Sequence, residues 1–213
     1  MKNLLYLSLL LLIAFSSCKK EGSAPYVVYQ DNLTTDRQTW EVDSGSYYVR
    51  DFAQGHYDIR VDTINRIIFS LAPYATISWP YTVQVDGTTV LDTTNLLGNV
   101  AVVFNYTDNI DFTVAEIWTN GTYRIWTRVN GNTSTVVDYT YSSAINTGTG
   151  SKNTIKLVQN QSSTQLLINN VSMVTLNMPL PSGFVATGPA VATAVAEFTP
   201  ETGLFNNFSI SKN

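Results

Sequence analysis

The sequence predicts an all-β sandwich built from two antiparallel sheets, and three observations support this prediction. Short runs of Val, Ile, Thr and aromatic residues recur along the 213-residue chain between clusters of turn residues. No segment shows a sustained helical period with a cap. Residues 99–141 contain Asn120-Gly121 and Asn130-Gly131 between such runs, and Asn-Gly favours tight hairpins because both residues tolerate positive φ. This stretch therefore predicts a β-meander.

The N-terminal half is expected to form short strands separated by polar turns. Residues 55–62 alternate apolar and polar side chains, which is typical of a half-buried strand. Pro80 predicts an edge strand or a break, because proline has no N–H to donate. Asp86-Gly87 predicts a third hairpin turn. The expected strands are 26–29, 40–43, 46–50, 55–62, 64–71, 77–85 and 88–92.

The C-terminal half continues the same pattern after the meander. Residues 142–151 are rich in Ser, Thr and Gly and are expected to form a loop, as are residues 179–183. No internal repeat or linker is visible, so the sequence predicts a single domain over residues 26–213. The expected strands are 152–159, 164–169, 171–178, 190–198 and 204–211.

If both Asn-Gly turns are two-residue loops, the register of the meander is fixed and its side chains divide between two faces. The face that we expect to be core holds Phe112, Val114, Glu116, Trp118, Tyr123, Ile125, Thr127, Val129, Ser134, Val136 and Asp138. The opposite face, which we expect to be open to water, holds Thr113, Ala115, Ile117, Arg124, Trp126, Arg128, Thr133, Thr135, Val137 and Tyr139.

The water-facing side supplies the candidate ligand-binding residues, Arg124, Trp126, Arg128 and Tyr139. A flat aromatic ring with hydrogen-bonding neighbours suits a sugar, since the C–H face of the sugar stacks and its hydroxyls need fixed partners. Two alternatives remain open. Trp126 could instead brace the two arginines through cation–π contacts, or a single bulge could reverse the register.

The first residues predict export and lipidation. Lys2 is followed by the apolar run Leu4–Phe15 and by Ser16-Ser17-Cys18. The apolar run is shorter than the roughly 20 residues that cross a bilayer. Residues 1–17 therefore predict a signal peptide, with Cys18 as the lipidation site and residues 18–25 as a lipidated tether, as in the bacterial lipoproteins that this segment resembles. The alternative is an ordinary signal peptide with an incidental cysteine.

This anchor predicts a lipid-anchored protein at the outer membrane or cell surface of a Gram-negative bacterium, which contacts the membrane through the lipid only. The formal net charge is −4, and an acidic, lysine-poor chain is a poor binder of phosphates. Nucleic acid is therefore not an expected partner. Cys18 is the only cysteine, so no disulfide can form within the chain.

Several segments match the motifs of a known β-sandwich fold. They are the strand and turn GNVAVVFNYTDNIDF at 98–112, the following hairpin NGTYRIWTRVNGN at 120–132, the later hairpin Ile168–Val171 and the closing strand Phe205–Ile210. These segments resemble the concanavalin A-like jelly roll, the fold of many lectins, glucanases and laminin-G-like domains. The resemblance covers most of residues 26–213 and implies a jelly-roll β-sandwich, but it does not imply one function.

The laminarinase-type hydrolases of this fold carry Glu-x-Asp-x-x-Glu on one strand. Glu41-Val42-Asp43 matches the first half, but Ser44, Gly45 and Ser46 stand where the third carboxylate belongs. Glycoside hydrolysis needs two carboxyls, so no catalytic residue is predicted here. No cofactor is expected either, with calcium at Asp108 and Asp111 as the alternative to ordinary Asx turns.

Together these features predict a surface lipoprotein whose jelly roll binds a poly- or oligosaccharide without hydrolysing it. A protein-interaction or adhesion module of laminin-G type, with protein partners at the cell surface, is the first alternative. A glycoside hydrolase with an atypical site, in which Glu41 or Glu116 would act, is the second.

Overall fold

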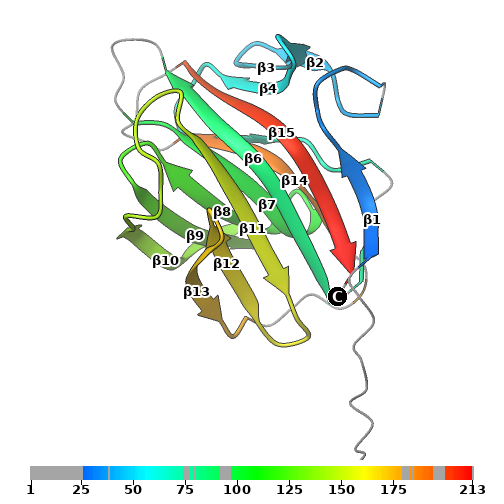
Figure 1. The fold of residues 1–213 in the computed structure, drawn as a ribbon, viewed down its shortest axis with the longest axis vertical. Coiled ribbons are helices and arrows are strands. Elements are labelled where there is room, and N and C mark those ends of the chain that lie inside the picture. The colour runs from blue at the N-terminus through cyan, green and yellow to red at the C-terminus, as the bar shows by residue number, and fades with distance from the viewer. Residues whose placement is uncertain are drawn as a thin grey trace, which may run out of the picture.

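Two antiparallel sheets pack face to face in the part of the chain that the structure describes (Figure 1). The structure is a computed structural model, and it describes residues 26–37, 39–73, 77–78, 80–91, 97–178, 183, 185–193 and 200–212. Every secondary-structure element assigned to these residues is a β-strand, so the all-β jelly-roll sandwich expected from the sequence is confirmed. Within the described ranges no helix is long and apolar enough to cross a membrane.

The first sheet has nine strands, and β15 lies at its centre. One edge of β15 pairs with β6, and its other edge pairs with β4 and then with β1. The strands of this sheet, in spatial order, are β13 (Val171–Leu176), β12 (Thr164–Ile168), β11 (Lys152–Gln159), β6 (Tyr81–Leu91), β15 (Glu201–Lys212), β4 (His56–Val61), β3 (Tyr48–Ala53) and β2 (Asp43–Gly45), with β1 (Tyr26–Asp31) beside β15.

The second sheet has six strands and contains the predicted meander as β7 to β10. Its remaining strands, β14 and β5, come from distant parts of the chain and extend the sheet beyond β7. In spatial order the strands are β10 (Asn132–Tyr141), β9 (Thr122–Val129), β8 (Asp111–Trp118), β7 (Asn99–Asp108), β14 (Ala186–Thr193) and β5 (Arg66–Phe69).

The main core fills the space between the two sheets. Its largest fully buried side chains include Tyr57, Tyr81, Phe205 and Phe208 from the nine-stranded sheet, and Phe104 from the six-stranded sheet. Burying one large apolar side chain contributes about 1.5–3 kcal/mol, so this cluster is the main stabilising feature of the sandwich.

The predicted turn at Asp86-Gly87 is wrong, because β6 runs through it without interruption. Gly87 is required there by close approach of the sheets: a Cβ at this position would lie 2.9 Å from Cγ2 of Val100. Asp86 serves the sheet rather than a turn, since it accepts a hydrogen bond of 2.6 Å from Oγ1 of Thr154 on β11.

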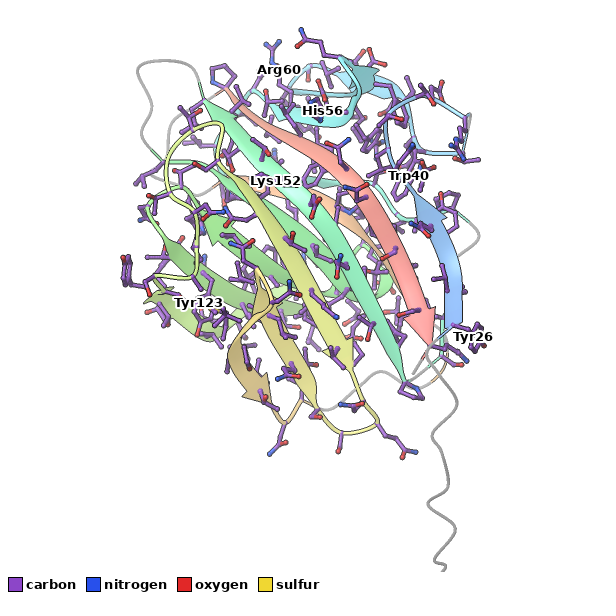
Figure 2. All side chains as sticks on the ribbon, in the orientation of Figure 1. Tyr26, Trp40, His56, Arg60, Tyr123 and Lys152 are labelled. Atoms are coloured by element: carbon purple, nitrogen blue, oxygen red, sulfur yellow. The ribbon has the colours of Figure 1, made fainter. Side chains whose placement is uncertain are left out.

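Strand boundaries also shift around Trp40. Residues 40–43 were expected to form a strand, but β2 begins only at Asp43, and Trp40 is a buried anchor outside the strands (Figure 2). Its ring lies 5.2 Å from that of Phe208, and its Nε1 donates to Oδ2 of Asp31 at 3.2 Å. The break expected at Pro80 is confirmed, because β6 starts at the next residue.

The two Asn-Gly turns of the meander have different lengths. Asn130-Gly131 is the two-residue loop that the sequence predicts: φ is 50° and 80° at its two residues, and Val129 pairs with Asn132. Asn120-Gly121 belongs to a three-residue loop that starts at Thr119, in which the N–H of Gly121 donates to the carbonyl of Trp118 at 3.0 Å. Only Gly121 of these three has positive φ, at 86°.

The longer loop moves the register between β8 and β9 by one residue, so Ile117 pairs with Tyr123. The predicted assignment of faces is therefore wrong for β8, and the reversal of register that the sequence left open comes from the longer loop, since the β8–β9 pairing itself is regular. Ala115 and Ile117 face the core together with Tyr123 and Ile125. The side chains of β8 that were expected in the core, Phe112, Val114, Glu116 and Trp118, lie instead on the outer side with Arg124, Trp126 and Arg128.

A further shift corrects the position of Val137. The pairing of β10 with β9 is irregular between Thr135 and Val137 and again between Val137 and Thr140. Val137 consequently packs against the core between the sheets, although it was expected on the water-facing side. Tyr139 keeps its predicted side and lies with Arg124.

Some predictions fall on residues that the structure does not describe. The signal peptide, Cys18 and the tether all lie before residue 26. The strand expected at 190–198 is β14, which begins earlier and ends at Thr193, and residues 194–199 lie outside the described ranges. Most of the loop expected at 179–183 also lies outside them.

Candidate functional site

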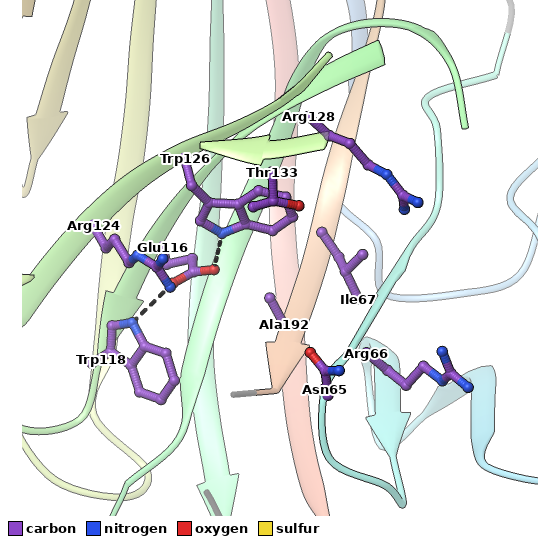
Figure 3. A pocket seen from close by; sticks show the side chains of 10 residues that line it. All are labelled: Asn65, Arg66, Ile67, Glu116, Trp118, Arg124, Trp126, Arg128, Thr133 and Ala192. Atoms are coloured by element: carbon purple, nitrogen blue, oxygen red, sulfur yellow. Dashed lines mark hydrogen bonds between the residues drawn. The ribbon is translucent and has the colours of Figure 1, made fainter. Parts of the chain in front are cut away.

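A pocket with a volume of about 330 Å³ opens on the outer side of the six-stranded sheet (Figure 3). Strands β8, β9 and β10 supply one side of it, and β14 and β5 supply the other. The residues that line it are Asn65, Arg66, Ile67, Glu116, Trp118, Arg124, Trp126, Arg128, Thr133 and Ala192.

The register of the sheet explains why this side is hollow. Across the strands, Glu116 lies opposite Ala101, Ala101 opposite Ala190, and Ala192 opposite Ile67. Alanines therefore occupy the middle strands, while large side chains stand on β8 and β9 and on β5. Small residues between two rows of large ones leave a depression that a ligand can enter.

Glu116 is the central polar group of the pocket and is only 2% exposed. Nε1 of Trp118 donates to its Oε2 at 3.1 Å, and Nε1 of Trp126 donates to its Oε1. Burial raises the pKa of Glu116 to about 7, against the opposing effects of the Trp126 hydrogen bond and the charge of Arg124. The carboxyl group thus fixes the orientation of two indole rings that form one side of the pocket.

Arg124 lies opposite Glu116 across the β8–β9 pair and is held by the next strand. One of its terminal nitrogens donates to Oγ1 of Thr135 at 3.0 Å and the other to Oη of Tyr139 at 3.4 Å. Its guanidinium also lies over the ring of Tyr139, 5.1 Å from the centroid. Arg124 thus makes its cation–π contact with Tyr139 and not with Trp126, which was the alternative that the sequence left open.

Arg128 and Arg66 approach the pocket from opposite strands. In Figure 3 both side chains extend to the same side of the pocket, with Ile67 between them. Nε of Arg128 donates to the carbonyl of Gly131 at 3.2 Å, which ties its stem to the Asn130-Gly131 turn. Arg66 lies over the ring of Tyr47 at 5.5 Å.

Trp126 is less accessible than the sequence predicts, with only 8% of its surface exposed. Its ring meets that of Phe112 edge to face at 5.7 Å, within a second apolar cluster on the outer side of the sheet. Trp126 therefore forms a wall of the pocket and is not an open platform.

The structure brings three of the four predicted site residues, Arg124, Trp126 and Arg128, to one pocket. Tyr139 lies beside them, against Arg124 and 5.6 Å from the ring of Trp118. Sequence reasoning put Glu116 and Trp118 on the wrong face, and it placed Thr133 on the correct face without assigning it to the site. It missed Asn65, Arg66, Ile67 and Ala192 altogether, because these residues reach the pocket through long-range strand pairing, which no local pattern of the sequence reveals.

The carboxylates considered from the sequence alone lie elsewhere. Glu41 and Asp43 both form ion pairs with Arg50 near β2 and β3, with Asp43 Oδ1 at 2.7 Å from Arg50 Nε, and neither lines the pocket. Asp108 accepts the N–H of Ile110, and Asp111 accepts that of Asn130, both at 2.8 Å. Among the described residues no group of three His, Cys, Asp or Glu side chains could hold a metal ion.

A second cavity of about 510 Å³ lies where β7, β8 and β9 meet Asn177 and Met178. Its polar side chains are largely engaged already: the hydroxyls of Thr113 and Thr127 lie 3.3 Å apart, and Thr127 also donates to the carbonyl of Phe112 at 3.1 Å. Arg128 lines this cavity as well, but no Trp side chain does, so it offers a ligand less aromatic surface than the pocket around Glu116.

No protein-family model and no curated protein sequence matches this chain. Solved structures show the fold. The carbohydrate-binding module CBM66 from Bacillus subtilis aligns with a TM-score of 0.61 and 15% identity, over 82% of this chain and 96% of the module.

Two hydrolases have the same fold. A laminarinase catalytic domain from Thermotoga petrophila aligns with a TM-score of 0.59 and 5% identity, over 89% of this chain and 98% of that domain. A GlcNAcα1-4Gal-releasing endo-β-galactosidase from Clostridium perfringens gives 0.60 and 10%, over 90% of this chain and 64% of that protein. The concanavalin A-like jelly roll expected from the sequence is confirmed. The solved structures that share this fold include carbohydrate-binding and glycan-cleaving domains.

Proposed function

We propose that this protein is a lipid-anchored surface protein that binds carbohydrate without cleaving it, through the pocket around Glu116. The observation that carries this proposal is the pocket itself, whose lining combines two indole rings, three arginine side chains and a single carboxyl group. Aromatic walls beside convergent polar groups are typical of sites that hold a sugar. The fold that this chain shares with CBM66 supports the proposal.

The lining of the pocket favours binding over hydrolysis. Glycoside hydrolysis by the usual mechanisms needs two carboxyl groups, about 5 Å or 6.5–9.5 Å apart according to the stereochemistry. Glu116 is the only carboxylate among the residues that line the pocket, and each of its oxygens accepts an indole N–H. Its raised pKa would suit a general acid, but no partner of the required kind lines the pocket.

The proposed location rests on the sequence of residues 1–25. A tether that ends just before β1 would hold the sandwich close to the membrane. Such a protein would retain a glycan near the cell surface.

A blocking substitution tests the function without removing core contacts. Thr133 and Ser134 are exposed neighbours on β10 whose side chains point to opposite faces, and only Thr133 lines the pocket. We expect Thr133→Trp to weaken binding at least tenfold, about 1.4 kcal/mol, and Ser134→Trp to change it little. Binding is measured with a glycan array and thermal shift on the Cys18→Ser protein, with calcium and with chelator.

Two results would contradict the proposal. One is equal binding by both tryptophan variants, which would place the site elsewhere. The other is no retention of any glycan, which would favour the protein-interaction alternative. Release of reducing ends that is lost in Glu116→Gln would instead establish a hydrolase.

A further inference from the structure

The pocket has a charge opposite to that of the protein. The chain as a whole has a formal net charge of −4. The lining of the pocket, by contrast, contains Arg66, Arg124 and Arg128 against Glu116 as its only acidic residue. An excess of positive charge within an acidic protein draws an anionic ligand to this place rather than to the general surface.

Hydrogen-bonding capacity in the pocket is unbalanced in the same direction. A guanidinium group offers five N–H donors and no acceptor. Glu116, the strongest acceptor of the pocket, already receives the N–H groups of Trp118 and Trp126. The hydroxyls of a neutral sugar need both donors and acceptors, whereas a carboxylate or sulfate needs donors only. The pocket therefore fits an anionic group better than a neutral one.

The three arginines that line the pocket have different roles. Arg124 stands opposite Glu116 and favours its ionised form by its charge, and its two terminal nitrogens are already engaged by Thr135 and Tyr139. Arg128 is tied only through Nε, to the carbonyl of Gly131, and within the described residues its two terminal nitrogens make no other hydrogen bond. Arg66 reaches the same side of the pocket from β5 (Figure 3).

On the basis of the proposed carbohydrate-binding function, we propose that the pocket recognises an acidic glycan. Its carboxylate or sulfate group would be bound by the terminal nitrogens of Arg128, with Arg66 adding a second positive charge on the same side of the pocket. Two parallel N–H···O bonds from one guanidinium give such a contact both strength and orientation. Carboxylate and sulfate share this chemistry, so the experiment separates them.

Matched pairs of glycans test the proposal. One pair is an oligogalacturonate and its methyl ester, and the other is a sulfated galactan oligosaccharide and its desulfated form. Titration calorimetry on the Cys18→Ser protein measures each affinity at low and at high salt. We expect the anionic member of at least one pair to bind at least tenfold more tightly, and this preference to shrink as salt rises. Which pair responds identifies carboxylate or sulfate as the recognised group.

Three variants locate the contact. Arg128→Gln should lower affinity for the anionic member about tenfold more than it lowers affinity for the neutral member, since only the anionic member accepts charge-assisted hydrogen bonds from this guanidinium. Arg128→Lys should lie between, because it keeps the charge and loses the planar fork. Arg60→Gln is the control: Arg60 lies on β4 of the other sheet, paired with Asp62 at 2.7 Å (Figure 2). It should bind both members as the unchanged protein does.

The outcomes separate the two proposals. Equal affinity for both members of each pair, still lost in Thr133→Trp, would overturn the acidic-glycan inference and leave the carbohydrate-binding function standing. An anionic preference that Arg128→Gln leaves unchanged would likewise overturn it, because the contact would lie elsewhere. Absence of binding to every glycan tried would overturn both. Thermal melts of each variant confirm that it is folded.

Discussion

The two Asn-Gly turns on either side of β9 share a dipeptide and differ in geometry. At Asn130-Gly131 both residues take positive φ and the loop has two residues. At Asn120-Gly121 only the glycine does, and Thr119 joins the loop. The side chain of Asn120 accepts the N–H of Thr122 at 3.1 Å, which stabilises the longer form. The dipeptide therefore marks a turn without fixing the length of its loop.

This difference of one residue decides which side chains form the pocket. With two-residue loops at both turns, Glu116 and Trp118 would lie on the face away from Arg124 and Trp126. The three-residue loop places all four on the same side, where Glu116 receives both indole N–H groups. The composition of the candidate site thus depends on the turn at Thr119–Gly121.

The largest expected effect comes from shortening that turn. Deleting Thr119 would force β8 and β9 into the other register and turn Ile117 and Ala115, both at most 2% exposed, away from the core. We expect the variant to lose its cooperative unfolding transition. Circular dichroism and a thermal melt check this.

A change of register at the other turn provides the matched comparison. One glycine inserted after Gly131 shifts β10, an edge strand that is exposed along most of its length. It should cost about 1–2 kcal/mol and leave a cooperative transition, because few contacts are lost. A deletion variant as stable as the insertion variant would mean that the register of β8 does not depend on this turn.

Local patterns in the sequence predict the strands and the sandwich, but not the whole site. Alternating apolar residues indicate β4, and the Asn130-Gly131 turn is predicted correctly. The local pattern at Asp86-Gly87 predicts a turn, because the reason for a glycine there, the close approach of Val100 from the other sheet, is invisible in one segment. Arg66 and Ala192 enter the pocket through the pairing of β5, β14 and β7, which joins segments far apart in the chain.

The next prediction concerns the pH dependence of stability, which we expect to differ between variants on the outer and the inner side of β8. The pKa of Glu116 is raised from 4.5 to about 7, so the folded protein holds this proton more tightly than the unfolded chain does. This tighter binding of the proton stabilises the folded protein fully below about pH 4.5. As pH rises to about 7 the stabilisation is lost, and the free energy of unfolding falls by up to about 3 kcal/mol.

The variant Glu116→Gln removes this titration and keeps an acceptor for one of the two indole N–H groups. We therefore expect the unchanged protein to lose stability relative to Glu116→Gln between pH 5 and pH 8, measured by urea unfolding. The inward-facing side of β8 offers the control, because Thr113→Val removes a polar group that does not titrate and should give a difference independent of pH. A flat difference for Glu116→Gln would show that this carboxyl group has an ordinary pKa.

The smallest effect compares the two glycines directly. Both have positive φ, 86° at Gly121 and 80° at Gly131, so alanine costs about 1 kcal/mol at either through backbone strain. A Cβ at Gly121 would also lie 3.0 Å from Thr147 Cγ2 and 3.0 Å from Tyr141 Cε2, whereas at Gly131 the nearest atom is 3.8 Å away. We expect Gly121→Ala to lower the free energy of unfolding by about 2 kcal/mol and Gly131→Ala by about 1 kcal/mol, measured by urea unfolding. Equal losses of unfolding free energy in the two variants would mean that the side chains of Thr147 and Tyr141 move aside at no cost. The three-residue loop would then be held by its own hydrogen bonds and not by the packing around it.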